Sequence, residues 1–278
     1  MIIDGKEIAN DIKEKLKREV SARDSAPTLV IVSIGENLVS EKFLSVKKKF
    51  AADIGVLVEE KKLDTNVSED EVVETISMST LKNTGIIVQL PLPKSIDAQK
   101  ILNAIPPAHD VDVLSEGSFK LYKEGTLPVL PPVVAAMKEI LFRHNVFVGN
   151  KNVLIVGKGK LVGLPAAIWF ERHQSNVTAI DEHVSSPIPY TLVADILVLG
   201  AGSPHFLKPD MIKEGVVILD AGTSTEFSTS TSESSGKLLG DADPACAGKS
   251  SLFTPVPGGI GPVMVAMLFK NLMEITRQ

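Results

Sequence analysis

A glycine-rich turn between an apolar strand and a helix limits the fold of this chain more than any other feature. The apolar run 152–156 leads directly into the sequence Gly157-Lys158-Gly159-Lys160-Leu161-Val162-Gly163, and a helical pattern follows through Trp169. The glycines let the backbone turn tightly, expose its amides to a pyrophosphate and bring the helix N-terminus close to that anion. An acidic residue, Asp181, ends the next predicted strand about 20 residues later, as the dinucleotide-binding fingerprint requires. The turn therefore predicts a Rossmann-type domain, with a glycine-rich turn that holds no cofactor as the alternative.

The predicted dinucleotide site combines this turn with the acidic end of the next strand. It comprises Gly157, Lys158, Gly159, Val162, Gly163, Asp181 and Glu182. An aspartate at this strand end accepts hydrogen bonds from the free 2′-hydroxyl of NAD, whereas the 2′-phosphate of NADP would meet two carboxylates. Lys158 argues in the other direction, because a lysine in the turn could reach that phosphate. We expect NAD as the cofactor, with NADP as the alternative.

The first half of the chain alternates helix-period and strand-period segments. Predicted helices cover 6–22, 40–52 and a segment behind Ser68, and predicted strands cover 29–32, 56–61 and 85–88. Strands separated by helices of this length form a parallel sheet that is covered on both faces. The fold class is therefore α/β, with an N-terminal αβα domain that has a parallel-rich sheet and a Rossmann-type dinucleotide-binding domain.

A proline-punctuated connector at 127–132 separates the two halves, and a helix is predicted over 133–142. In the second half, predicted strands cover 177–180, 194–199 and 216–219, the Ser/Thr-rich stretch 224–236 predicts a loop, and the last predicted helix runs from Pro262 to Ile275. We place the N-terminal domain at residues 1–121, completed by the C-terminal helix 262–278. The Rossmann-type domain then takes residues 122–261.

Composition excludes several classes of protein. The chain has 278 residues with a formal net charge of −5, and its lysines and arginines are scattered, so nucleic acid and anionic membranes are not expected as partners. No stretch of about 18 apolar residues lacks a charge or a Pro/Gly break, which argues against a membrane span. Cys246 is the only cysteine, and the five histidines show no metal-ligand spacing, so we expect neither a disulfide nor a metal. The chain opens without a basic and apolar leader, so the cytoplasm is the expected compartment and a small molecule the expected partner.

Three motifs in the same order give the chain its resemblance to a known family. They are Gln89-Leu90-Pro91-Leu92-Pro93, Asp110-Val111-Asp112 and Thr254-Pro255-Val256-Pro257-Gly258-Gly259-Ile260-Gly261-Pro262. The segments 35–37 and 40–47 and the turn ending in Val162-Gly163-Leu164-Pro165 match as well. The chain resembles the FolD family of bifunctional methylenetetrahydrofolate dehydrogenases and methenyltetrahydrofolate cyclohydrolases nearly from end to end.

The resemblance implies an activity and a set of site residues. It implies oxidation of 5,10-methylenetetrahydrofolate by a nicotinamide cofactor and hydrolysis of the methenyl product to 10-formyltetrahydrofolate, within one-carbon metabolism and purine biosynthesis. The implied catalytic residues are Lys47, Gln89 and Asp112, and the implied folate-binding residues are Phe43, Leu90, Pro91, Pro257, Gly258 and Gly259. A lysine near apolar groups can move protons to or from water, and a carboxylate can accept two N–H bonds from a pterin edge. The resemblance also implies a homodimer that forms through the cofactor domain.

Several residues depart from the family pattern. The family tyrosine four residues before the lysine is Phe43, the glycine after the aspartate is Val113, and the threonine after the Pro-Gly-Gly stretch is Met264. The Pro-Cys-Thr-Pro run is Pro128-Val129-Leu130-Pro131, and two positions of the cofactor turn hold Gly159 and Leu164.

Three interpretations therefore stay open. The chain is an active folate enzyme, a non-catalytic or single-activity homologue that binds folate or dinucleotide, or an unrelated Rossmann dehydrogenase of the shikimate type. Taken alone, Lys47 within Lys47-Lys48-Lys49 could belong to a solvated helix face, and Asp112 could simply end a strand.

Overall fold

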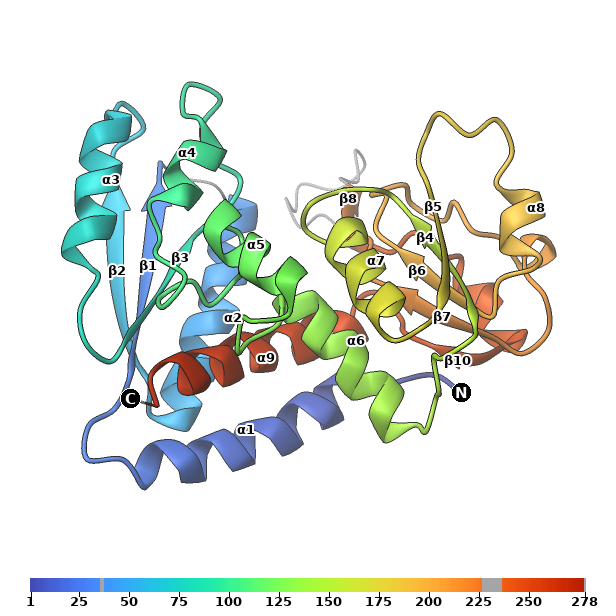
Figure 1. Ribbon diagram of the computed structural model, residues 1–278, viewed down its shortest axis with the longest axis horizontal. Coiled ribbons are helices and arrows are strands. Elements are labelled where there is room, and N and C mark those ends of the chain that lie inside the picture. The colour runs from blue at the N-terminus through green and yellow to red at the C-terminus, as the bar shows by residue number, and fades with distance from the viewer. Residues whose placement is uncertain (36–37, 227–236, 278) are drawn as a thin grey trace. The chain divides into compact units, whose positions relative to one another are not determined.

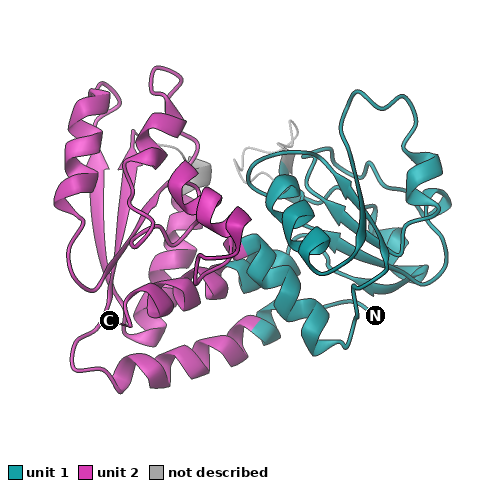
Figure 2. Ribbon diagram, viewed as in Figure 1, with its two compact units in different colours: residues 1–8, 133–264 teal, residues 9–132, 265–278 magenta. Residues whose placement is uncertain are grey.

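The computed structural model describes residues 1–35, 38–226 and 237–277, and the chain divides into two compact units. Unit 1 contains residues 1–8 and 133–264, and unit 2 contains residues 9–132 and 265–278 (Figure 2). The predicted domain boundaries, at 121/122 and 261/262, stay predictions. No helix in the described ranges is both long and apolar enough to cross a membrane.

Unit 2 is built around a three-stranded parallel sheet (Figure 1). The strand order is β2-β1-β3, with β1 (Thr28–Ile34) in the centre between β2 (Leu57–Leu63) and β3 (Thr84–Val88). The strand β3 is buried along its whole length, whereas β2 alternates between exposed and partly buried residues, as an edge strand does. The prediction of an N-terminal parallel sheet is confirmed.

Helices cover both faces of this sheet. The helices of this part of the chain are α1 (Gly5–Ser21), α2 (Leu38–Ile54), α3 (Glu69–Met78), α4 (Ala98–Asn103), α5 (Glu116–Glu124) and the C-terminal α9 (Ile260–Ile275). On one face, side chains of β1 and β3 form a core with Val72 and Ile76 of α3 and Ile101 of α4. On the other, Gly85 of β3 lies so close to Leu272 of α9 that a Cβ there would be 2.6 Å from its methyl group. In addition, Phe50 of α2 stacks on Phe269 of α9 with ring centroids 5.0 Å apart.

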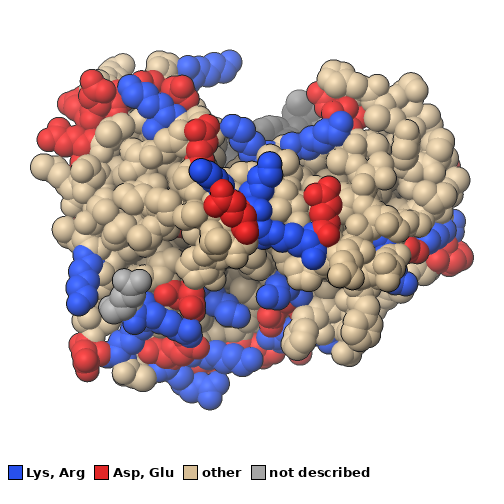
Figure 3. Space-filling view, viewed as in Figure 1, with Lys and Arg blue, Asp and Glu red and all other residues tan. Residues whose placement is uncertain are grey.

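Local sequence signals set where these helices begin. Ser68 forms a capping box with Glu71, in which each side chain accepts a hydrogen bond from the backbone of the other, and α3 begins directly behind Ser68 as predicted. The short helices α4 and α5 were not predicted. They begin behind the N-caps Asp97 and Ser115, and α5 ends at Gly125 in the left-handed conformation. On the face that Figure 3 displays, the acidic first turn of α3 forms one red cluster, while basic and acidic side chains are mixed elsewhere on unit 2.

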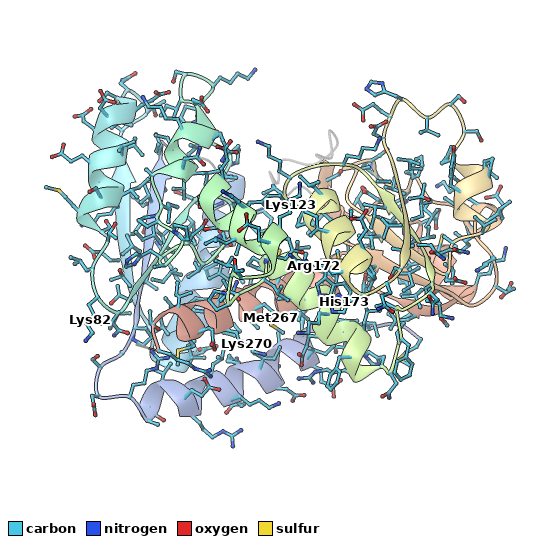
Figure 4. The ribbon with its side chains drawn as sticks, viewed as in Figure 1. Lys82, Lys123, Arg172, His173, Met267 and Lys270 are labelled. Atoms are coloured by element: carbon cyan, nitrogen blue, oxygen red, sulfur yellow. The ribbon has the colours of Figure 1, made fainter. Side chains whose placement is uncertain are left out.

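Unit 1 contains a five-stranded parallel sheet with the order β10-β7-β6-β4-β5. Its strands are β4 (Asn152–Val156), β5 (Asn176–Ile180), β6 (Ile196–Leu199), β7 (Val216–Asp220) and β10 (Ser250–Phe253). Helix α6 (Pro132–Arg143) precedes the first of these strands, and α7 (Gly163–Arg172) and α8 (Ile188–Thr191) lie in the connections between strands, together with two 3₁₀ turns at Pro209–Met211 and Pro244–Gly248. Arg172 and His173 mark the end of α7 in Figure 4. This parallel sheet with crossover helices confirms the predicted Rossmann-type fold.

Two segments of unit 1 differ from the prediction. The strand β10 was not predicted, because its four residues follow a 3₁₀ turn and show no apolar run of their own beyond Leu252 and Phe253. The predicted loop 224–236 begins as a strand, since β8 (Ser224–Glu226) pairs antiparallel with β9 (Lys237–Leu239). The rest of that predicted loop, 227–236, lies outside the described residues, as do Glu36 and Asn37.

Candidate active site

A lysine and a glutamine meet at one end of the unit 2 sheet. Phe43 and Lys47 are one turn apart on α2 and therefore share a face of that helix, and Gln89 follows β3 directly. The ammonium Nζ of Lys47 donates a hydrogen bond of 3.1 Å to Oε1 of Gln89. The Nε2 of Gln89 donates in turn to the carbonyl of Leu90 at 2.7 Å, which fixes the amide so that its oxygen faces the lysine. The structure thus brings together two of the predicted catalytic residues, Lys47 and Gln89.

The three consecutive lysines of α2 have different environments. Lys47 is partly buried and bonded to Gln89, and Lys48 forms an ion pair with Glu60 of β2, whereas Lys49 is exposed. The alternative prediction, a solvated helix face at Lys47-Lys48-Lys49, therefore applies to Lys49 but not to Lys47. The ring of Phe43 is 42 % exposed and available to a ligand that lies against this face of α2.

Asp112 lies within electrostatic range of Lys47. Burial raises the pKa of the Asp112 carboxyl most strongly, the negative charge of Asp110 raises it further, and the positive charge of Lys47 lowers it. Asp110 itself is fully buried and accepts hydrogen bonds from the backbone amides of Leu114 and Ser115 at 3.3 and 2.9 Å. Asp110 therefore has a structural role in the turn before α5. Asp112 is less buried than Asp110, and it is the carboxyl whose pKa the charge of Lys47 lowers.

The residue after Asp112 is held in an unusual backbone conformation. Val113 has a φ of +57°, in the left-handed region, and its side chain is buried. A β-branched residue is rare in this region and costs about 1–2 kcal/mol there, whereas a glycine adopts it freely. The structure therefore keeps, with a valine, the backbone conformation that suits the glycine found at this position in the family pattern.

The other predicted folate-binding residues lie in two turns. Leu90 and Pro91 follow Gln89 and are joined by a cis peptide bond. Pro257, Gly258 and Gly259 belong to unit 1, where the carbonyl of Gly258 accepts a hydrogen bond from the amide of Gly5 at 2.8 Å. This turn is therefore anchored to the start of α1.

The glycine-rich turn of unit 1 has the close contacts that require glycine. Gly157 has a φ of +94°, and a Cβ there would lie 2.5 Å from the carbonyl oxygen of Gly200. A Cβ on Gly163 would lie 1.7 Å from the carbonyl oxygen of Gly157, so only glycine lets α7 start this close to the turn. A Cβ on Gly159 would meet no atom within 4 Å, which explains why this position accepts a serine in the family pattern. Val162 precedes α7 and provides no side-chain cap, so the predicted anion site is not blocked by a polar side chain of its own.

Lys158 and Asp181, the two oppositely charged residues of the predicted ribose site, form an ion pair with each other. Nζ of Lys158 lies 2.8 Å from Oδ2 of Asp181, and Oδ1 of Asp181 accepts the amide of His183 at 3.2 Å. The hydrogen bond from Lys158, followed by that from His183, holds the pKa of Asp181 below its usual value. The turn lysine is thus paired with the carboxylate of Asp181, and the carboxylate of the next residue, Glu182, is exposed to solvent.

Two buried aspartates that sequence reasoning missed shape the carboxyl edge of the unit 1 sheet. Asp220 accepts the amides of Gly222, Asp241 and Ala242 at 2.9, 3.2 and 2.8 Å. Asp241 accepts the amides of three consecutive residues, 201–203, at 2.7–3.1 Å. Burial raises the pKa of both, that of Asp220 to about 6. They hold together the loops that follow β6 and β7, and dinucleotides bind at this edge of such sheets.

These features define a two-domain α/β protein with a Rossmann-type nucleotide-binding domain, a class that includes many oxidoreductases. Comparison with known proteins identifies the family. The chain belongs to the tetrahydrofolate dehydrogenase/cyclohydrolase family, whose catalytic-domain profile matches residues 3–112 and whose NAD(P)-binding-domain profile matches residues 131–278. The predicted family is confirmed.

Individual relatives match along the whole chain. A bifunctional protein FolD of Nitratiruptor sp. is 33% identical over 285 residues, covering 100% of this chain and 98% of that protein. A bifunctional mitochondrial methylenetetrahydrofolate dehydrogenase/cyclohydrolase of Gallus gallus is 35% identical over 291 residues, covering 98% of this chain and 85% of that protein. The crystal structure of FolD from Campylobacter jejuni has a TM-score of 0.93 at 29% identity, covering 100% of this chain and 98% of that one.

More distant structures share the fold alone. A shikimate 5-dehydrogenase from Thermus thermophilus has a TM-score of 0.51 at 11% identity, covering 90% of this chain and 98% of that one. The interpretation as an unrelated dehydrogenase of the shikimate type is therefore wrong, because family membership rests on both domains, whereas this likeness extends only to the fold.

Proposed function

We propose that this protein oxidises 5,10-methylenetetrahydrofolate with a nicotinamide cofactor and hydrolyses the resulting 5,10-methenyl compound to 10-formyltetrahydrofolate. The observation that carries the proposal is the hydrogen bond between Lys47 and Gln89, with Asp112 in electrostatic range of the same lysine. Two relatives with these activities in their names, from Gallus gallus and Campylobacter jejuni, cover 98% and 100% of this chain. A non-catalytic binding protein would not need a lysine that is positioned in this way by Gln89.

The three residues take distinct parts in the proposed reaction. The Asp112 carboxylate accepts two N–H bonds from the aminopyrimidine edge of the pterin and so orients the ring. Lys47 moves a proton to or from the water that adds to the methenyl carbon, after which the bond from that carbon to N5 breaks and leaves the formyl group on N10. Gln89 holds the lysine through its Oε1. The nicotinamide, when bound, accepts the hydride that leaves the methylene carbon.

The cyclohydrolase half of the proposal can be tested without any dinucleotide. Purified protein mixed with the 5,10-methenyl compound should speed its loss of absorbance above the rate of the spontaneous reaction in the same buffer. A rate equal to that of the protein-free sample would contradict the assignment of hydrolysis to this chain.

We further propose that NAD is preferred over NADP. The relatives do not decide this point, because a FolD of Trypanosoma brucei, 28% identical with a TM-score of 0.92 and covering 100% of this chain and 97% of that one, was crystallised with NADP. In this chain the ion pair between Lys158 and Asp181 satisfies the turn lysine, and Glu182 adds a further negative charge beside it. A 2′-phosphate would have to break that pair and approach two carboxylates, whereas a 2′-hydroxyl can donate to Asp181.

We expect kcat/KM to be about tenfold higher with NAD⁺ than with NADP⁺. The variant Asp181→Asn should narrow this ratio, because it removes one carboxylate and releases Lys158 to bind the phosphate. Glu182→Gln, which leaves the ion pair intact, is the matched control and should narrow it less. A wild-type preference for NADP⁺, or an unchanged ratio in Asp181→Asn, would contradict the proposed role of the ion pair.

We also propose a homodimer that forms through unit 1. The strand β5 is at the edge of the five-stranded sheet, and Asn176, Thr178 and Ala179 on it are exposed. An uncovered edge strand presents backbone groups that pair with a second copy. Sedimentation velocity should show a dimer for the wild type and a shift toward monomer for Ala179→Lys, since a charged side chain on an edge strand opposes pairing. A monomeric wild-type protein at micromolar concentration would contradict this arrangement.

The cytoplasmic location and the contribution to purine biosynthesis stay predictions.

A further inference from the structure

One buried side-chain amide links two loops of unit 2. Asn271 of α9 is 5 % exposed, and its Nδ2 donates hydrogen bonds to the carbonyl of Val111 at 2.9 Å and to the carbonyl of Leu130 at 2.8 Å. Both acceptors are carbonyls, so the nitrogen, and not the oxygen, of the amide must face them. Both N–H groups are used, and a rotation of the side chain would break both bonds. In Figure 4, the labelled Met267 and Lys270 identify α9, on which Met267 is buried and Lys270 is exposed.

The first of these carbonyls belongs to the residue directly before Asp112. Among the described residues, no group forms a hydrogen bond with the Asp112 carboxylate, so its direction depends on the backbone that carries it. That backbone is fixed on both sides. Before Asp112, Val111 is fully buried and bonded to Asn271, and after it, the chain returns through amides that Asp110 accepts.

The backbone between these anchors has an intrinsic tendency to relax. Val113 is held at a φ of +57°, which a valine leaves readily when nothing constrains it. Without the bond from Asn271 to the Val111 carbonyl, the segment 111–113 would lose one of the contacts that keep it in this conformation. The loss would also leave the buried carbonyl of Val111 and the partly buried carbonyl of Leu130 without this donor.

We propose that Asn271 is a positioning residue for folate recognition, which holds the Val111 carbonyl and thereby directs the Asp112 carboxylate toward the pterin. This inference rests on the proposed function, in which Asp112 binds the aminopyrimidine edge. The binding energy that depends on Asn271 is the same in the ground state and in the transition state, because the aminopyrimidine edge that Asp112 binds forms and breaks no bonds in the reaction. Removal of Asn271 therefore acts on KM and spares kcat.

The test compares Asn271→Leu with Thr276→Val. Leucine has a similar size and no donor, and Thr276 is a matched control. Thr276 lies one residue beyond α9, is nearly as buried, and its side chain bonds to Arg23 and Leu272 and not to the segment 111–113. We expect Asn271→Leu to raise the KM for the folate substrate about tenfold, with kcat within about twofold and the KM for the dinucleotide unchanged. Thr276→Val should leave the folate KM unchanged even where it lowers the melting temperature as much. An unchanged folate KM in Asn271→Leu, or an equal rise in Thr276→Val, would overturn the proposal.

Two further variants keep the outcome decisive. If Asn271→Leu does not fold, Asn271→Ser, which retains one donor, should show a smaller rise in the folate KM, and no rise would overturn the proposal. In an Asp112→Asn background, Asn271→Leu should add little to the KM, because both substitutions remove the same interaction. If Asp112→Asn raises the folate KM and Asn271→Leu does not, the positioning role fails and the proposed function stands. If Asp112→Asn itself leaves the KM unchanged, the proposed function of Asp112 fails, and the positioning role fails with it.

Discussion

Replacement of Lys47 by methionine should abolish hydrolysis of the 5,10-methenyl compound and leave the fold intact. In the proposed mechanism the Nζ of Lys47, which donates to Gln89 at 3.1 Å, transfers the proton, and methionine keeps most of the length of the side chain without a proton to transfer. Loss of a positioned general acid–base group lowers the rate by about a hundredfold or more. Because Lys47 is bonded to a neutral amide and is only partly buried, its removal should change the free energy of unfolding by no more than about 1 kcal/mol.

The cyclohydrolase rate and the melting temperature should be measured on the same preparations. Lys49→Met is the matched control, since Lys49 lies two residues further along α2 and is exposed. It should retain the wild-type rate. A Lys47→Met protein that is stable and still active would remove Lys47 from the mechanism, and equal losses in both variants would point to helix α2 rather than to the lysine.

The second large effect is expected at Asp112. Asp112→Asn should weaken folate binding by about 2–5 kcal/mol, the range found when one partner of a buried charged hydrogen bond is removed. An asparagine has the same shape but offers one acceptor and one donor, so it cannot accept two parallel N–H bonds from the pterin edge. Titration calorimetry with the folate substrate measures the loss directly. Unchanged affinity would leave Asp112 with a structural role only.

The same substitution should not destabilise the fold. The pKa of Asp112 is raised, mainly by burial, so its charged form is less favourable in the folded chain than in the unfolded one, and the stability it costs at neutral pH is recovered as the pH falls toward that pKa. Asp112→Asn removes this unfavourable charge.

Asp110→Asn is the opposite case, because Asp110 accepts two backbone amides, and it should lower the free energy of unfolding by about 1–3 kcal/mol. Folate binding by the wild type should decrease on acidification at a higher pH than an ordinary carboxylate would give, since protonation removes an acceptor.

The sheets of both units could be predicted because most of their inner strands are apolar runs between helices. Strands such as 29–32 and 153–156 are buried on both faces, and a parallel arrangement follows from the length of the connections. The short elements α4, α5 and β10 could not be predicted, since two or three buried positions in each do not establish a period. Their positions depend on caps and on packing against a sheet that is formed by distant parts of the chain.

The candidate site also contains residues that the sequence predicted and residues that it did not. Lys47, Gln89 and Asp112 were predicted from motifs, and the structure places the first two in contact and the third within electrostatic range. Asn271, Asp220 and Asp241 were not predicted as site residues. They act on backbone amides and carbonyls, which every residue has, so no pattern of side chains indicates their partners. The pairing of Lys158 with Asp181 was equally hidden, because the two residues are 23 positions apart and each was considered as a ligand of the dinucleotide.

The central claim is that a chain with these altered residues keeps both folate activities, and one measurement tests it most directly. Wild-type protein is given 5,10-methylenetetrahydrofolate with NAD⁺ in one sample and NADP⁺ in another, and absorbance is recorded for the reduced nicotinamide and for the methenyl compound. We expect reduced nicotinamide to form in both samples and faster with NAD⁺, while the methenyl compound stays below the amount of nicotinamide reduced, because it is hydrolysed in the same active site. No reduction of either nucleotide, or a methenyl compound that accumulates in equal amount and disappears only at the spontaneous rate, would contradict the account.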